Sequence, residues 1–449
     1  MEQTMNLGER IRKRRKELKL TADELAHRIG KDRSTVFRYE NGDIDNVPSD
    51  ILEAISIALE ITPQKLMGWT NEMFEKTADT KQNGSTVNNE SISKTVISKE
   101  NKMKFDREKY LSYCFDTVKR LMDVPSPSGY SREIAGLLSD IANEQGFSLE
   151  ATKKSCFFMT YEGKSHDSAL GIAAHCDTLG AMVRSIDGSG DLNFTPVGGV
   201  LCNSLDGEYC FVITREGKRY TGTILSRSPS VHVYSDARSR SRDADNMYVR
   251  LDENVKSAAD TRALGIENGD YICFDPKTVV TESGYLKSRF IDDKASVACI
   301  LTAFKIMKDA GIVPEKDIKF LVSMYEEVGH GAAFVPANLE SMLAVDMGCI
   351  GKDLKCDEHT LSICAKDAGG PYDYELTSKL IDMAKSAQLN YCVDLYPFYG
   401  SDVGAMWRAG HDVPGALIGP GVHASHGMER THADALMATV ELILMYFGV

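Results

Sequence analysis

Histidines and acidic residues follow short apolar runs at several places beyond residue 170. In chain order they are His175 and Asp177, Asp292 and Asp293, Glu326 and Glu327, Asp346, and the three histidines His423, His426 and His432. The ends of buried strands are where α/β sheets present ligands and catalytic groups. Together these positions offer His, Asp, Glu, Asp and His in that order. Five nitrogen and oxygen ligands with one shared carboxylate suit two zinc-like ions about 3.5–4 Å apart.

Each position taken alone has a simpler interpretation. A histidine such as His175 at a strand end is more often a hydrogen-bonded core residue, and the adjacent aspartates of RFIDD are more often a solvated turn. Two acids that close an apolar strand, as Glu326 and Glu327 do, are costly to bury unpaired. One of them can bind a metal while its neighbour acts as general base. A metal-bound imidazole commonly needs a carboxylate to fix its tautomer, and Asp177 supplies one.

The elements that must position these residues differ along the chain. From about residue 105 onward, helical patterns alternate with short apolar runs such as IKFLVSMYEE and VPGALIGPG, which predicts an α/β domain with a mostly buried sheet. Between about 185 and 285, many short strands with frequent glycine predict a small β-rich domain inserted into it. Residues 72–104 are polar and almost free of aromatics, which predicts a flexible linker.

The order and spacing of the histidines and acids resemble the glutamyl and tetrahedral (TET) aminopeptidases, family forty-two of the metallopeptidases in clan MH. The resemblance spans about residues 108–449 and rests on the blocks PSPSGYSREIAGLL, AHCDTLGAMV, RFIDDKASV, SMYEEVGHGA, LAVDMG, GSDVGAM and SHGMERTH. It implies a metallo-aminopeptidase domain at 105–449 with a phosphorylase/hydrolase-like α/β fold and an inserted β-barrel, PDZ-like domain. It also implies two divalent metal ions per chain, which would be zinc, cobalt or manganese.

The resemblance further implies a role for each position. The metal ligands would be His175 and Asp346 on one ion, Glu327 and His426 on the other, and Asp292 as the bridge between them. Glu326 would be the general base for the water that attacks the first peptide carbonyl, and Asp177 would orient His175. The family usually has Glu four residues after its last ligand, whereas Glu429 lies three residues after His426. His432 is therefore the second choice for that ligand and His423 the third.

The first seventy residues have the pattern of a small helical module. Thr21 opens the sequence TADE, a capping box for a helix that ends at Gly30. A basic, hydroxyl-rich stretch follows and stops at Asn41-Gly42. Two helices joined by a short turn that contains glycine are what a helix-turn-helix requires. A helical bundle that mediates protein contacts is the alternative.

The stretch LGERIRKRRKELKLTADELAHRIGKDRSTVFRYENG, followed by DILEAISIALEITPQKLMGW, resembles the Cro/CI-type (XRE) helix-turn-helix family. This resemblance implies a DNA-binding domain at 1–71 that recognises specific double-stranded sequences, usually as a dimer. The side chains that would face bases or nearby phosphates are Arg33, Ser34, Thr35 and Arg38. The basic side chains of the first helix, Lys13, Arg14 and Arg15, would contact the DNA backbone or be solvated.

Charge and cysteine usage limit the partners and the compartment. The net charge is -13, and residues 1–70 are neutral, so the rest of the chain carries all of it. An acidic protein does not bind nucleic acid as a whole, but a local module can. No apolar run is long enough for a transmembrane helix, which excludes a membrane-spanning protein. The 11 cysteines form no CxxC pair and indicate reduced thiols in the cytoplasm.

We therefore expect a cytoplasmic, metal-dependent aminopeptidase that removes N-terminal residues from peptides and is coupled to a sequence-specific DNA-binding domain, in a homo-oligomer. Two alternatives stay open. One is a transcription regulator whose peptidase-like domain senses peptides without turning them over. The other is a clan MH deacylase that acts on N-acyl amino acids.

Overall fold

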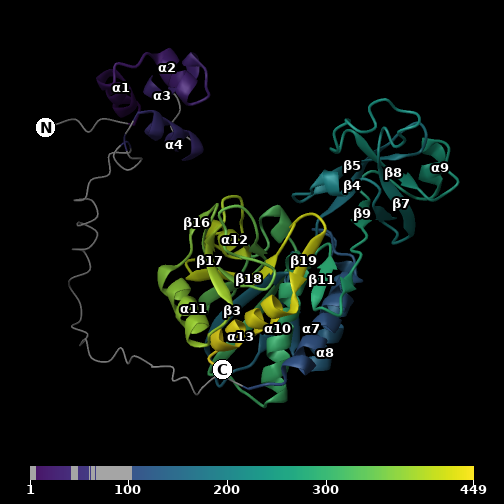
Figure 1. Cartoon of the computed structure of the whole chain (residues 1–449), viewed down its shortest axis with the longest axis vertical. Coiled ribbons are helices and arrows are strands. Elements are labelled where there is room, and N and C mark those ends of the chain that lie inside the picture. Colours follow the sequence, from purple (N-terminus) through teal and green to yellow (C-terminus); the bar gives the residue numbers. More distant parts are fainter. Residues whose placement is uncertain (1–6, 42–48, 60, 62–65, 67–103) are drawn as a thin grey trace. The chain divides into compact units, whose positions relative to one another are not determined.

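The computed structural model describes residues 7–41, 49–59, 61, 66 and 104–449. Its contacts divide the chain into two compact units, residues 1–95 and 96–449. The predicted linker at 72–104 lies, apart from its last residue, outside the described residues. Figure 1 shows the small helices of the first unit and the sheets and helices of the second.

The N-terminal unit contains four described helices, α1 (Leu7–Glu17), α2 (Ala22–Arg28), α3 (Arg33–Asn41) and α4 (Ser49–Ala58). Ile11, Leu25 and Val36 contribute to one buried core. The capping box is present, since the Thr21 hydroxyl accepts the Glu24 amide at 3.1 Å and the Glu24 carboxylate accepts the Thr21 amide at 2.7 Å.

One basic side chain of α1 has a structural role instead of the expected DNA or solvent contact. Arg15 is buried, and its guanidinium donates to both carboxylate oxygens of Glu40 at 2.5 and 2.8 Å. Its third contact is the main-chain oxygen of Leu20 at 2.9 Å. Arg15 therefore ties α1 to α3 and is not free to contact DNA.

The second unit is built on a ten-stranded sheet in the order β1-β2-β12-β3-β13-β18-β15-β16, with β14 beside β18 and β17 beside β15. The strands are β1 (Ser148–Ala151), β2 (Phe157–Tyr161), β3 (Ser165–His175), β12 (Lys316–Ser323), β13 (Leu339–Val345), β14 (Gly348–Cys349), β15 (Leu361–Asp367), β16 (Gly370–Pro371), β17 (Tyr391–Leu395) and β18 (Gly415–Val422). The central strands β12, β3, β13 and β18 are mutually parallel. Their carboxyl ends therefore meet at one edge of the sheet.

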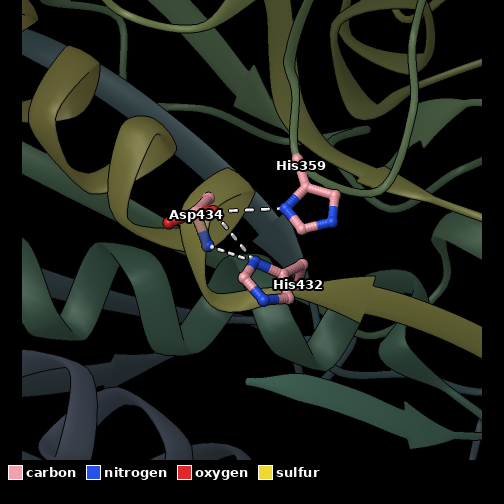
Figure 2. A group of neighbouring side chains, drawn as sticks. All are labelled: His359, His432 and Asp434. Atoms are coloured by element: carbon pink, nitrogen blue, oxygen red, sulfur yellow. Dashed lines mark hydrogen bonds and ion pairs between the residues drawn. The ribbon is translucent and has the colours of Figure 1, made fainter. Parts of the chain in front are cut away.

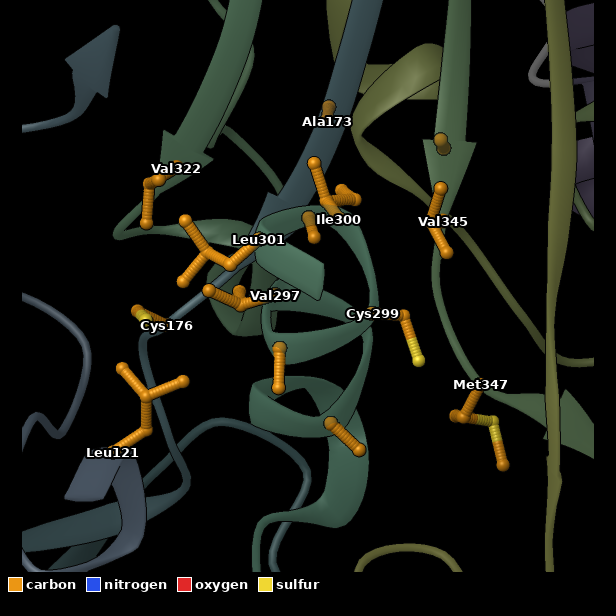
Figure 3. Close-up of a cluster of buried hydrophobic side chains, with 14 of the residues drawn as sticks. Leu121, Ala173, Cys176, Val297, Cys299, Ile300, Leu301, Val322, Val345 and Met347 are labelled. Carbon is orange, nitrogen blue, oxygen red and sulfur yellow. The ribbon is translucent and has the colours of Figure 1, made fainter. Parts of the chain in front are cut away.

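Helices pack around this sheet: α7 (Arg107–Met122), α8 (Arg132–Gln145), α10 (Ile291–Asp309), α11 (Tyr374–Ser386), α12 (Asp402–Arg408) and α13 (Ala433–Tyr446). The nearly fully buried α10 packs against α7, α13 and β3. Figure 3 shows part of this core, where Val297, Ile300 and Leu301 of α10 lie among side chains from the central strands. A helix whose surface is apolar over most of its length is buried in such a core.

Six strands form a closed barrel in the order β4-β5-β8-β7-β6-β9. They are β4 (Gly180–Ile186), β5 (Leu192–Val197), β6 (Tyr209–Ile213), β7 (Arg219–Ser226), β8 (Met247–Leu251) and β9 (Tyr271–Phe274), with η2 (Cys202–Ser204) and α9 (Ala258–Ala263) in the connections. The chain enters the barrel after β3 and returns to the α/β part before α10. A small third sheet, β10 (Val279–Val280), β11 (Tyr285–Ser288) and β19 (Glu429–His432), follows at this junction.

No helix within the described part of the chain is both long and apolar enough to cross a membrane.

Candidate active site

The five predicted metal ligands converge at the carboxyl edge of the parallel strands. His175 ends β3, Asp346 follows β13, Glu327 lies in the short helix η3 (Glu326–Val328) after β12, Asp292 opens α10, and His426 lies in the loop between β18 and β19. The fold thus brings together side chains that are up to 251 residues apart in sequence, as His175 and His426 are. The parallel arrangement of β3, β12, β13 and β18 is the reason for four of them, because residues at or after these strand ends lie at the same edge. Asp292 reaches this edge from the start of α10.

Asp292 lies between two groups of candidate metal ligands. Its Oδ1 is 3.1 Å from Nε2 of His175, and its Oδ2 is 3.6 Å from Nε2 of His426. On the His426 side, Oε2 of Glu327 lies 3.5 Å from the same Nε2 atom. On the other side, Oδ2 of Asp346 lies 4.0 Å from Nε2 of His175. This arrangement, with one carboxylate oxygen toward each group, is what a bridging ligand requires.

The structure adds a sixth candidate ligand, Asp293, which follows Asp292 in the motif RFIDD. Its Oδ2 accepts the His175 amide at 3.2 Å, while its buried Oδ1 has no hydrogen-bond partner within the described part of the chain. His175, Asp293 and Asp346 offer ligand atoms within 4.8 Å of one another, as do His175, Asp292 and Glu327. An orphaned buried carboxylate oxygen beside imidazole and carboxylate donors fits a cation site.

Asp177 contacts the site differently from the sequence expectation. Nδ1 of His175 is 2.9 Å from the main-chain oxygen of Asp177 but 3.6 Å from its carboxylate. The carboxylate instead accepts the main-chain amides of Glu326 at 3.1 Å and Glu327 at 3.2 Å, and the Ser128 hydroxyl at 2.5 Å. The carbonyl of Asp177 therefore orients the imidazole, and its side chain holds the glutamate pair in place.

Glu429 links two of the predicted ligands, a role that sequence reasoning missed. Its carboxylate accepts the amide of His426 and the amide of Asp292, both at 3.0 Å. Burial raises the pKa of Glu429 to about 8. The sequence signal for this residue is the three-residue spacing between His426 and Glu429, which departs from the family motif.

Of the three loop histidines, His426 lies beside Asp292 and Glu327. Its Nδ1 is 2.8 Å from the main-chain oxygen of Gly199, which leaves Nε2 facing the carboxylates. His432 ends β19, where its Nε2 is 2.9 Å from the oxygen of Ser283. His423 is exposed and pairs through its backbone with Arg430.

Glu326, the predicted general base, lies with its Oε2 3.8 Å from Nε2 of His175. Burial, together with the charges of Asp346 and Asp402, raises the pKa of Glu326 well above its ordinary value. Asp402, in the motif GSDVGAM, opens α12. Its Oδ1 accepts the Ser323 hydroxyl at 3.2 Å and the Ala332 amide at 2.9 Å, so it holds both ends of the segment that carries Glu326.

The buried carboxylates of the site outnumber the histidines that could balance their negative charge. Burial raises the pKa of Asp346 to about 7 and that of Glu327 well above its ordinary value, and neighbouring carboxylates add to both shifts. Burial alone would lower the pKa of His175, but the carboxylates around the ring, led by Asp292, outweigh burial and raise it well above its ordinary value. Divalent cations would relieve this repulsion, so the residues present fit a metal centre.

In the N-terminal unit, the residues predicted to bind DNA lie on α3. Arg33, Ser34 and Arg38 are exposed, and Thr35 is half-buried. The Ser34 hydroxyl donates to Oδ1 of Asp32 at 2.6 Å, and the Thr35 amide donates to the same atom at 2.8 Å. These hydrogen bonds, led by that from Ser34, lower the pKa of Asp32 to about 2. Asp32 therefore caps α3, and Ser34 and Thr35 donate to its carboxylate.

Comparison with known proteins identifies both units. The model of the M42 glutamyl aminopeptidase family matches residues 155–442. The chain belongs to this family. A helix-turn-helix family model matches residues 11–66, so the M42 peptidase carries an XRE-type helix-turn-helix domain at its N-terminal side. M42 peptidases are metal-dependent hydrolases, in agreement with the donor groups at the sheet edge.

Relatives and solved structures agree with this assignment. The chain is 42% identical to "Putative aminopeptidase YhfE" of Bacillus subtilis (strain 168), over 74% of this chain and 96% of that protein. The TET aminopeptidase of Thaumarchaeota archaeon SCGC AB-539-E09 has the same fold, with a TM-score of 0.67 at 21% identity over 74% of this chain and 96% of that one. Pyrococcus horikoshii TET1 peptidase, which can assemble into a tetrahedron or a large octahedral shell, matches with a TM-score of 0.65 at 21% identity, over 74% of this chain and 98% of that one.

Proposed function

We propose that this M42 peptidase is a dinuclear metal aminopeptidase whose helix-turn-helix domain binds specific double-stranded DNA. The observation that carries the catalytic proposal is the position of Asp292, with one carboxylate oxygen toward His175 and the other toward His426. Asp346 would complete the first ion's ligands and Glu327 the second's. The excess of buried carboxylates supports two divalent ions, zinc, cobalt or manganese, because each brings two positive charges.

The residues of the chain divide the chemistry between them. The bound ions would supply Lewis-acid chemistry at the first peptide carbonyl and at water. Glu326 would accept the proton of the attacking water and pass it to the leaving amine, because its carboxylate lies beside His175 and its raised pKa suits a group that both takes and gives a proton. The Asp177 carboxylate would fix the positions of Glu326 and Glu327 by accepting their main-chain amides.

The direct test is a substrate panel with the metal-loaded protein. We expect hydrolysis of aminoacyl-anilides in the presence of Zn²⁺, Co²⁺ or Mn²⁺, and no hydrolysis of N-acyl amino acids. The reverse preference would indicate the deacylase. Failure of both substrate classes with two ions bound would indicate a peptide sensor.

The assembly and the compartment are also proposals. All eleven cysteines fall within the described residues and are free thiols, which supports a reducing, cytoplasmic compartment. The oligomeric Pyrococcus TET1 peptidase supports a homo-oligomer here, and a dimer would suit a helix-turn-helix domain on a palindromic site. The outward side chains of α3 support DNA binding.

A further inference from the structure

A second group of potential ligands lies outside the five predicted ones. His359 in the loop before β15, His432 at the end of β19 and Asp434 in the first turn of α13 offer ligand atoms within 4.8 Å of one another. Figure 2 shows the two imidazole rings turned toward the Asp434 carboxylate. Nδ1 of His359 and Nδ1 of His432 each lie 3.2 Å from Oδ2 of Asp434.

The hydrogen bonds of His432 determine its tautomer. Nε2 lies 2.9 Å from the main-chain oxygen of Ser283, which only accepts, so Nε2 carries a proton. Nδ1 accepts the main-chain amide of Asp434 at 3.1 Å, so Nδ1 has a lone pair. The Asp434 carboxylate also faces Nδ1, at 3.2 Å. An ion bound to Nδ1 would take the place of the amide hydrogen bond and would attract this carboxylate.

The spacing and the surrounding contacts fit a metal ion. Ligands about 2.0–2.1 Å from a tetrahedral Zn²⁺ are about 3.3 Å apart, close to the two distances of 3.2 Å. The nitrogens that would not bind the metal have partners, since Nε2 of His359 is 3.1 Å from the Tyr285 hydroxyl. Arg107 binds the other Asp434 oxygen, Oδ1, at 2.9 Å and leaves Oδ2 for the ion. Such outer contacts orient metal ligands.

We propose that His359, His432 and Asp434 form an additional binding site for a divalent transition-metal ion of the zinc type. Two imidazoles and one carboxylate are donors that Zn²⁺ accepts. The side chain of Asp434 is 48% exposed and that of His359 39% exposed, so water can complete the coordination. The ion would connect the β15 loop, β19 and α13. Because β19 begins with Glu429, it would also brace the strand that holds Asp292 and His426.

The test counts zinc in the full-length protein. Wild type, His359→Ala and Asp434→Asn are stripped with a chelator, equilibrated at one buffered free Zn²⁺ concentration and analysed by mass spectrometry of the metal. We expect both variants to bind one equivalent fewer than wild type. His232→Ala, which removes an exposed histidine of the barrel part, is the matched control and should bind the wild-type number. Asp434→Asn keeps the shape of the side chain, and circular dichroism verifies that each variant is folded.

The count also separates this site from the catalytic proposal, on which it does not depend. Asp292→Ala should lose zinc from the catalytic centre, and adding His359→Ala to it should remove one further equivalent. Equal zinc in wild type, His359→Ala and Asp434→Asn would overturn the additional site and leave a proton shared between the histidines and Asp434. Unchanged zinc in Asp292→Ala alone would instead overturn the dinuclear centre.

Discussion

At the residue scale, the contacts of Asp292 and Glu326 support the two different roles that we propose for them, metal ligand and general base. Asp292 faces a histidine on each side, whereas the carboxylate of Glu326 lies 3.8 Å from Nε2 of His175. The adjacent acid Glu327 lies 3.5 Å from His426 instead, so we propose different roles for the two glutamates. Substitutions that keep shape but change proton affinity can distinguish these roles.

Glu326→Gln should lower kcat by about 10²–10⁴-fold while both ions stay bound. Gln keeps the shape of the side chain but cannot accept a proton at neutral pH. Asp292→Ala, in contrast, should lose metal outright, because a bridging carboxylate serves both ions. Turnover and metal content are measured on the same samples. Near-normal rates for Glu326→Gln, or two ions retained by Asp292→Ala, would rule out the dinuclear mechanism.

The contacts of Asp177 predict an effect on the glutamate pair. Asp177→Asn places an NH₂ group against the amide of Glu326 or Glu327, and a buried unpaired donor costs about 1–3 kcal/mol. We expect at least a tenfold loss of kcat and weaker binding of the ion held by Glu327. Ser128→Ala removes only the hydroxyl bond to the same carboxylate and should have a smaller effect. Equal effects of the two substitutions would contradict this role.

At the element scale, the apolar runs were enough to predict the α/β domain, the inserted β-rich part and the strand ends that carry the site. His175, Asp346 and the glutamate pair follow apolar runs because a parallel sheet buries its strands and exposes their ends. Asp402 and Glu429 could not be assigned in this way. Their carboxylates act by accepting amides from segments distant in sequence, and no local pattern records such contacts. The spacing of His175 and Asp177 likewise could not predict that the main-chain oxygen of Asp177, and not its carboxylate, contacts His175.

The carboxyl edge of the sheet should make the metal-free protein less stable as the pH rises. In the folded state the pKa of Asp346 is raised to about 7, that of Glu429 to about 8 and that of His426 to about 10. The folded protein therefore holds protons that the unfolded chain releases, and the stability they provide is lost between about pH 4 and pH 10. The Tm of the metal-free protein should fall steadily from pH 6 to pH 9.

Metal binding should reverse this trend. Divalent ions replace the protons as the positive charge in the site, so the Tm gain on adding Co²⁺ should be larger at pH 8.5 than at pH 6. Differential scanning calorimetry of stripped and Co²⁺-loaded protein measures both curves. A metal-free Tm that rises over this range would mean that the buried carboxylates are not the dominant titrating groups.

At the scale of the whole molecule, the chain combines two units that we expect to be separable. Contacts divide it into residues 1–95 and 96–449, and the polar sequence at 72–104 is predicted to link them. Limited proteolysis should cut first within 72–104 and release two folded fragments, identified by mass spectrometry and circular dichroism. A single resistant body with no early cut in that range would contradict the predicted linker.

DNA binding should depend on the outward face of α3 in the full-length protein. Arg33 and Arg38 are exposed there, and each arginine that reads a base contributes about 1–3 kcal/mol. On a site enriched from random duplexes, Arg33→Ala with Arg38→Ala should weaken binding at least tenfold in a fluorescence-anisotropy titration. The dependence of affinity on salt should also become less steep if phosphate contacts are lost.

The matched control for this measurement is Arg238→Ala, which removes an exposed arginine from the peptidase unit and should leave the affinity unchanged. The acidic balance of that unit is the reason, because a surface with excess negative charge repels the DNA backbone. If Arg238→Ala weakened binding as much as the double substitution, the peptidase unit would be contributing a DNA surface. If the double substitution bound like wild type, α3 would not be the helix that reads the DNA.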